Sequence, residues 1–204
     1  MTAAREKGRL WAPWRMEYIR RAETSARAVR GRGPAAVRTR RRRAAAGGEC
    51  LFCRLGSGAD DRRELVLVRR PHAFLMLNRF PYNPAHLMVV VERHAATFGS
   101  LTDDERRELL ELTALAERAL EAEYRPQGVN YGANVGRVAG AGYPGHLHLH
   151  LVPRWDGDTN FMPVVGETKV LPESLDRTWS RLRRAVRDLD SAGARAVRRR
   201  GSRR

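Results

Sequence analysis

Histidine and leucine alternate along the stretch GHLHLHLVPRW, residues 145–155. Successive side chains point to opposite faces of a β-strand, so a repeat of two predicts a strand with imidazoles on one face and leucines on the other. The leucine face is typical of a buried core, but histidine is seldom chosen to fill one. The face that carries His146, His148 and His150 is therefore the first candidate for a functional site.

The spacing of these histidines limits what they can do together. Side chains at i and i+2 lie about 6.6 Å apart along a strand, and those at i and i+4 about 13 Å apart. Zinc–nitrogen bonds of about 2.0–2.1 Å cannot join all three to one ion from a straight strand. At least one histidine must therefore act otherwise, by proton transfer or nucleophilic attack. Two alternatives stay open: a polar strand face, and a zinc hydrolase with His146 and His148 as ligands.

The net charge of +16 is concentrated at the two ends of the chain. Residues 1–48 hold 14 Lys or Arg and 3 Asp or Glu, residues 181–204 hold 10 and 2, and residues 49–180 hold 15 and 18. The Arg/Ala/Gly-rich stretch 26–48 has too few large apolar side chains to offset its ordering entropy. We expect both ends to be solvated tails, with non-specific contact to nucleic-acid phosphates as the alternative.

Targeting signals and membrane spans are not evident. The first residues lack the apolar region of a signal peptide. A membrane helix needs about 18 consecutive apolar residues, and no run in the sequence approaches that length. The two cysteines form one Cys-x-x-Cys pair, Cys50 and Cys53, which fits a reducing compartment. The expectation is a cytoplasmic protein with no membrane partner.

Strand and helix patterns are interleaved in the central part of the chain. Thr102 and Glu105 form a capping box that starts a helix, and Pro126 stops it. A final helix is expected from about Pro172 through Val186. Besides the histidine strand, strands are expected over residues 64–70, 73–80, 86–92 and 129–138. A hairpin-type turn at residues 81–84 favours an α+β fold with an antiparallel sheet.

A glycine-rich loop, AGAGYPG at residues 139–145, leads directly into the histidine strand. Small residues let a ligand approach the backbone, whose N–H groups can hold phosphate oxygens. Such a loop is a weak signal alone, and its position before three histidines strengthens it.

The histidine strand resembles the signature of the histidine triad (HIT) superfamily, His-x-His-x-His with apolar residues between. The flanking segments LNRFPYNPAHLMVV, NVGRVAGAG and PRWDGDTNFMPVVGETKVLPESL, together with LWAPWRMEYI near the start, resemble its diadenosine tetraphosphate (Ap4A) phosphorylase-like branch. The resemblance covers about residues 9–20 and 49–185. It implies a HIT-like sheet of about five strands, one long central helix and a C-terminal helix.

The resemblance also implies a division of the chain. A HIT domain would span residues 49–185, preceded by a family-like segment over 1–24. A basic, disordered linker over 25–48 and a basic tail over 186–204 would lie outside it.

Further implications concern the catalytic residues. His148 would attack the α-phosphate and form a covalent nucleotidyl-histidine, with its other ring nitrogen held by a backbone carbonyl. His150 would contact phosphate oxygens or the leaving group, as an imidazolium able to stabilise developing charge. His146, the first of the triad, would stand beside the reacting phosphate, and His86 would pack near the triad or in the core.

The residues expected to bind the nucleotide lie outside the triad. Asn78 would bind ribose hydroxyls, or merely form a turn at a strand end. Trp155 would stack on a base, or cap the core. Phosphate or ribose oxygens would be held by Asn134, Gly140, Ala141 and Gly142.

A zinc site is the last feature that the resemblance implies. Some relatives hold a zinc ion through residues that match Cys50, Cys53, His94 and His146. Four protein ligands close the coordination sphere, which is typical of a structural site. The alternative is two reduced cysteines and a surface His94. No organic cofactor is expected.

The expected activity is cleavage of dinucleoside polyphosphates such as Ap4A by a homodimer, with phosphate (phosphorylase) or water (hydrolase) as acceptor. A nucleoside phosphoramidase or nucleotidyltransferase of the same superfamily is one alternative. A zinc-containing module that binds nucleic acid through its basic ends is the other.

Overall fold

The computed structural model describes residues 50–166 and 170–201 of the 204-residue chain. The segments predicted over 1–24 and 25–48 lie outside these residues. The described chain divides into two compact units, and nearly all described elements belong to the one formed by residues 49–158 and 171–204. From the other unit, the short helix α5 (Met162–Val165) is described.

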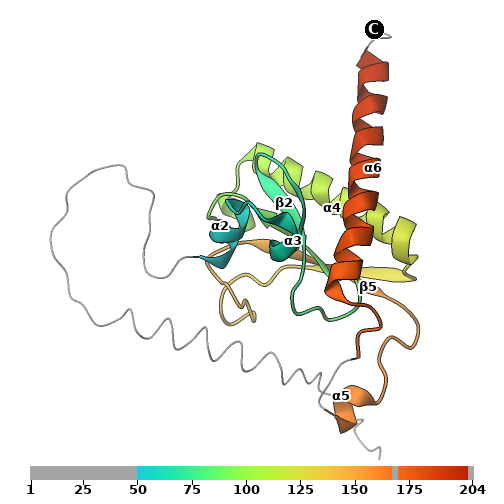
Figure 1. The fold of residues 1–204 in the computed structure, drawn as a ribbon. Coiled ribbons are helices and arrows are strands. Elements are labelled where there is room, and N and C mark those ends of the chain that lie inside the picture. Colours follow the sequence, from blue (N-terminus) through green and yellow to red (C-terminus); the bar gives the residue numbers. More distant parts are fainter. Residues whose placement is uncertain (1–49, 167–169, 202–204) are drawn as a thin grey trace, which may run out of the picture. The chain divides into compact units, whose positions relative to one another are not determined.

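The centre of the larger unit is a five-stranded sheet in which every pairing is antiparallel (Figure 1). The strand order is β1-β2-β3-β5-β4, so the strand that carries the histidines lies between β3 and β4. The strands span Val66–Arg69 (β1), Ala73–Leu77 (β2), Leu87–Val91 (β3), Gly128–Gly132 (β4) and His148–Arg154 (β5). The predicted α+β class and antiparallel sheet are confirmed.

Two long helices, α4 (Asp103–Tyr124) and α6 (Leu175–Gly201), pack on each other and contribute to one hydrophobic core. The predicted capping box starts α4: the Thr102 hydroxyl accepts the Glu105 N–H, and the Glu105 carboxylate accepts the Thr102 N–H. The predicted long central helix and C-terminal helix are therefore confirmed. Helix α6 continues to Gly201, beyond the boundary predicted near residue 185.

The second, smaller core is associated with helix α2 (Leu51–Gly56), which is followed by α3 (Asp61–Glu64). We call it the small cluster, and its buried members are Phe52, Leu55, Val66, Phe74, Met76, Met88 and Val90. Helix α2 contributes two buried side chains to it. This core is therefore built mostly from strand residues under one short helix.

Several expected strand limits are wrong. Strand β1 begins at Val66, because Glu64 belongs to α3, and β2 ends at Leu77 instead of residue 80. The strand expected over 129–138 ends at Gly132, and the chain then turns through Gly136 and Gly140, each with a φ of +84° that favours glycine. Strand β5 begins at His148, because His146 lies in a bend whose N–H bonds to the Tyr143 carbonyl. A short 3-10 turn, η1 (Phe98–Ser100), precedes α4. None of the described helices is long and apolar enough to cross a membrane.

Candidate active site

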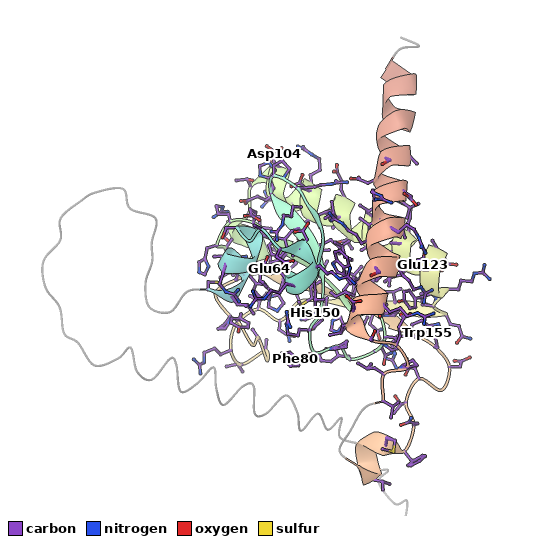
Figure 2. All side chains as sticks on the ribbon, viewed as in Figure 1. Glu64, Phe80, Asp104, Glu123, His150 and Trp155 are labelled. Carbon is purple, nitrogen blue, oxygen red and sulfur yellow. The ribbon has the colours of Figure 1, made fainter. Side chains whose placement is uncertain are left out.

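The register of the sheet places the triad. His148 lies opposite Val90 and His150 opposite Met88, two members of the small cluster. Side chains directly opposite each other across a strand pair share a face, so both imidazoles lie on the face of the small cluster. Leu147 and Leu151 belong to the other face, where they join the hydrophobic core shared with α4 and α6, here called the large core. Figure 2 labels His150 among the side chains of this region.

His148 is held by a backbone carbonyl. Its Nδ1 lies 2.8 Å from the carbonyl oxygen of His146, and a carbonyl can only accept a hydrogen bond. The proton of a neutral imidazole must then be on Nδ1, which leaves the lone pair on Nε2. The expected carbonyl partner is confirmed. His148 is 6% exposed, so the ring is largely shielded from water.

A second chain of hydrogen bonds ends on His150. The backbone N–H of Tyr82 lies 3.1 Å from His86 Nδ1, and His86 Nε2 lies 3.0 Å from His150 Nδ1. A backbone N–H can only donate, so His86 Nδ1 accepts and the proton of His86 is on Nε2. His86 then donates to His150 Nδ1, and a neutral His150 keeps its proton on Nε2. This direction of the hydrogen bonds, from Tyr82 through His86 to His150, favours a neutral His150 that donates through Nε2, instead of the expected imidazolium.

His86 therefore has a more specific place than the sequence predicted. It is fully buried, and its ring lies 5.1 Å from that of His150 and 4.7 Å from that of Tyr82, centroid to centroid. The sequence signal was a histidine heading an apolar strand. The Tyr82 contact that fixes its tautomer had no signal in the sequence.

His146 points away from this relay and toward the cysteines. Its Nε2 lies 2.7 Å from the Val91 carbonyl oxygen, while its Nδ1 lies 3.4 Å from Cys50 Sγ and 3.6 Å from Cys53 Sγ. The carbonyl fixes the proton on Nε2, so the Nδ1 lone pair faces the sulfur atoms. Burial lowers the pKa of His146 and favours its neutral form. Metal-ligating histidines usually donate one ring N–H to a carbonyl or carboxylate and direct the lone pair of the other nitrogen at the metal. The two nitrogens of His146 are arranged in this way.

The four residues predicted as metal ligands lie together. One possible ligand atom from each of Cys50, Cys53, His94 and His146 lies within 4.8 Å of the others. The His94 Nδ1 is 3.3 Å from Cys53 Sγ. Zinc–sulfur bonds of about 2.3 Å and zinc–nitrogen bonds of about 2.0 Å at tetrahedral angles separate N and S by roughly 3.5 Å. The observed N···S distances of 3.3–3.6 Å fit such a centre. These four described residues, here called the cysteine–histidine cluster, could hold a metal ion.

The Cys53 thiol of this cluster resists ionisation when no cation is bound. Burial, with smaller contributions from the neighbouring Cys50, raises the pKa of Cys53 to about 11. Metal ligation requires thiolates, so binding a cation must release protons from the cysteines.

Hydrogen bonds tie the glycine-rich loop to the segment just before it. The Asn134 amide donates to the Gly140 carbonyl at 3.3 Å, and the Ala141 N–H bonds to the Gly136 carbonyl. The C-terminal end of the loop lies beside the cysteine–histidine cluster, because a Cβ atom at Gly145 would lie 3.5 Å from His94 Nε2. Gly142 lies between these two ends and is half-buried.

Asn78 and Trp155 lie at the ends of strands. The Asn78 Oδ1 accepts the Phe80 N–H at 2.9 Å, as in the turn that was the alternative to ribose binding. Trp155 follows β5 and is half-buried, and its backbone N–H donates to the Asp158 carboxylate. Arg154 holds the pKa of Asp158 well below its usual range, so this anchor is ionised at neutral pH.

Phe52 is a site residue that sequence reasoning missed. It is 3% exposed, and its ring centroid lies 4.7 Å from that of His148 and 5.4 Å from that of His146. Its only sequence signal is its position between the two cysteines.

The site thus combines an antiparallel five-stranded sheet, two histidines on one of its faces and a third histidine just before the strand. The sequence profile of the HIT domain matches residues 61–157. The chain is 37% identical over 170 residues to a Mycobacterium tuberculosis protein named AP-4-A phosphorylase, which covers 83% of this chain and 80% of that protein. The chain therefore belongs to the HIT family.

Two further similarities agree with this membership. A protein of Arabidopsis thaliana named bifunctional bis(5'-adenosyl)-triphosphatase/adenylylsulfatase FHIT is 28% identical over 145 residues, 69% of this chain and 79% of its own length. A zinc-bound histidine triad family protein from Mycobacterium smegmatis superposes with a TM-score of 0.57 at 23% identity. That superposition covers 71% of this chain and 97% of the other, and it supports the fold.

Proposed function

We propose that this protein cleaves dinucleoside polyphosphates such as Ap4A through a covalent nucleotidyl-histidine at His148. The observation that carries the proposal is the hydrogen bond from His148 Nδ1 to the His146 carbonyl, which leaves Nε2 as a nucleophile at neutral pH. The relative from M. tuberculosis bears the name of an Ap4A phosphorylase, and the one from A. thaliana is named for cleavage of a related dinucleotide. These names support the substrate class.

The first step forms a bond between His148 Nε2 and the α-phosphorus and breaks the bond from that phosphorus to the rest of the polyphosphate. The leaving oxygen takes the electron pair, so Ap4A releases ATP. The second step breaks the P–N bond and returns its electron pair to Nε2. Attack by phosphate gives ADP, and attack by water gives AMP.

His150 supports both steps as a hydrogen-bond donor. The relay from Tyr82 through His86 aims the His150 Nε2–H away from His86, where a phosphate oxygen can accept it. A neutral donor held in place costs little reorganisation when charge develops on phosphate. His146 acts through its carbonyl, which positions His148, and through Nδ1 at the cysteine–histidine cluster.

The proposed nucleotide contacts follow from the positions of loops and strand ends around the triad. Backbone N–H groups at Gly140, Ala141 and Gly142, with Asn134, are proposed to hold phosphate or ribose oxygens. Trp155 is proposed to stack on a base. Asn78 is proposed to contact ribose through its amide N–H, since its carbonyl oxygen already accepts the Phe80 N–H.

Zinc is the proposed metal of the cysteine–histidine cluster. Two sulfur and two nitrogen donors at tetrahedral spacing are the set that zinc prefers. The ion would supply a structural cross-link and no open coordination position. His94 and His146 would thereby be tied to Cys50 and Cys53. No organic cofactor is proposed.

A homodimer is the proposed assembly. Strand β4 lies at an edge of the sheet and is mostly exposed, and a second copy could pair with it. We place the protein in the cytoplasm, where thiols stay reduced, and assign the HIT domain to residues 49–185. Arginines of the basic ends, 1–48 and 186–204, are proposed to contact nucleic-acid phosphates.

Product analysis on Ap4A, with and without inorganic phosphate, tests the proposal. ADP plus ATP that form only with phosphate would identify a phosphorylase, and AMP plus ATP without phosphate a hydrolase. His148→Ala must abolish either reaction. If the wild-type chain yields no product in either buffer, the dinucleotide assignment is wrong, and nucleoside phosphoramidates become the next substrates to assay.

A further inference from the structure

We propose that Phe52 is a positioning residue for His148, and that the cysteine–histidine cluster holds it there. The inference rests on the proposed function, because it assigns the orientation of the proposed nucleophile to an aromatic side chain on another element. Phe52 lies between Cys50 and Cys53 at the start of helix α2. The two proposed cysteine ligands and the residue that contacts His148 are therefore held on the same short segment.

Helix α2 depends on contacts with the rest of the fold for its position. It has six residues, and its N-cap, Cys50, makes no side-chain capping hydrogen bond. Helices this short are not stable without tertiary contacts. At its C-terminal end, the Arg69 guanidinium donates to the carbonyls of Leu55 and Gly56 at 2.6 and 2.5 Å. At its N-terminal end, the cysteines of the cysteine–histidine cluster are the corresponding anchor.

The ring of Phe52 lies where it can restrain an imidazole. Its centroid is 4.7 Å from that of His148 with an interplanar angle of 36°, and 5.4 Å from that of Tyr143 at 71°. Tyr143 belongs to the glycine-rich loop, so Phe52 joins the loop and the nucleophile. His148 also contacts the ring of His150, at 5.1 Å and 77°. Aromatic neighbours at these distances and a hydrogen bond at Nδ1 together leave the ring little freedom to turn.

Orientation matters for the chemistry assigned to His148. In-line attack needs Nε2 aimed at phosphorus, and small misplacements of a reacting group lower rates steeply. A hydrogen bond to the His146 carbonyl fixes one atom of the imidazole, and the ring plane still needs a second restraint. Phe52 supplies that restraint. Loss of the metal would free the N-terminal end of α2 and loosen the contact.

The matched comparison is Phe52→Leu against Phe74→Leu. Both residues belong to the small cluster, both are buried, and both changes remove one ring. Phe74 lies on β2, and its ring is close to the Arg69 guanidinium, 5.8 Å from centroid to carbon. Both variants should lose similar thermal stability. Only Phe52→Leu should lower kcat for Ap4A, by about tenfold, with KM within about twofold of wild type.

NMR of the full-length chain gives a readout that does not need activity. In zinc-loaded protein we expect cross-peaks between the Phe52 and His148 rings, and a single Nδ1–H tautomer of His148 in the imidazole ¹⁵N spectrum. Phe74→Leu should keep this spectrum. Phe52→Leu should shift or broaden the His148 signals, and so should removal of zinc from wild type by a chelator, reversed by added Zn²⁺. If Phe52→Leu does not fold, Phe52→Met replaces it.

The NMR and kinetic results separate this inference from the proposed function. An unchanged His148 spectrum in Phe52→Leu would overturn the positioning role, even if the enzyme cleaves Ap4A. An unchanged spectrum after zinc removal would overturn the link to the cluster. Equal losses of kcat in both Phe→Leu variants would show that Phe52 contributes only to packing of the small cluster and does not position His148. If the chain has no activity on Ap4A, the spectra alone decide.

Discussion

The two faces of the sheet differ in how they are held together. One face carries the large core, in which leucines and alanines of α4 and α6 pack on the leucines and valines of the strands. The other face carries the histidines, and its small cluster has one six-residue helix contributing two buried side chains. The first face can be stabilised by apolar burial alone. The second combines limited burial with hydrogen bonds and a possible metal centre, so it can hold reactive side chains in fixed orientations.

Stability and chemistry are divided between the two faces of strand β5. In β5, Leu151 is part of the large core, while His148 faces the small cluster. The strand period of two makes this division possible within consecutive residues. Within β5, changes to the buried leucines should therefore alter stability, and changes to the histidines should alter turnover.

The largest effect is expected for His148→Ala. Loss of the nucleophile removes the covalent route, so turnover should fall by about 10⁴-fold or more. Thermal stability should change far less than for a core substitution. Steady-state assays on Ap4A and thermal unfolding of the same preparation check both statements. Turnover within tenfold of wild type would remove His148 from the mechanism.

Leu112→Ala tests the opposite face. Leu112 lies on α4, is fully buried in the large core, and its truncation should lower the free energy of unfolding by about 3 kcal/mol. The kcat of the folded fraction should stay near that of wild type. Urea denaturation and kinetics at a temperature where the variant is folded measure the two quantities. A selective loss of kcat without destabilisation would contradict the division between the faces.

Two substitutions of His86 test the relay to His150. Gln can place an N–H donor near the position of His86 Nε2, whereas Asn is too short to reach His150 but can still accept the Tyr82 N–H. His86→Asn should lower kcat by about tenfold to a hundredfold, the usual range for a lost supporting hydrogen bond. His86→Gln should retain more activity than His86→Asn. The reverse order would show that the contact to Tyr82, and not the donor to His150, is what matters.

The smallest effect is expected for Glu105→Gln, at the start of α4. Hydrogen bonds from Arg93 are the main cause that lowers the pKa of Glu105 to about 2. The stability from this carboxylate is complete above its ordinary pKa of 4.5 and is lost as the pH falls through about 2. The substitution should cost about 1 kcal/mol at pH 7, since Arg93 is half-exposed, and the cost should shrink toward pH 2. Denaturation at several pH values checks this, and turnover should not change.

Much of this arrangement could be predicted from local sequence. The alternation of histidine and leucine predicted two faces, and Thr102 with Glu105 predicted the start of α4, because both features depend on neighbouring residues. The ligand set of the cysteine–histidine cluster also followed, through resemblance to relatives. Its members lie in three separate segments of the chain, so only the fold could bring them within 4.8 Å of one another.

Features that depend on tertiary contacts were not predictable. The strand order places β5 beside β3, and the pairing of Met88 with His150 brings the neighbouring His86 within reach of His150. No local pattern specifies that register. The early end of β4 also escaped prediction, because residues beyond Gly132 have strand-like composition but continue into a loop with two glycines at positive φ.

In the proposed mechanism, His148 forms a covalent bond with the nucleotide. The most direct measurement is to mix the wild-type chain with Ap4A, quench within one turnover at alkaline pH, and locate any attached nucleotide by peptide mass spectrometry. An adenylyl group on the peptide that contains His148, absent from His148→Ala and lost on mild acid treatment, is the predicted result. Rapid turnover with no attached nucleotide, or attachment to another residue, would rule out His148 as the nucleophile.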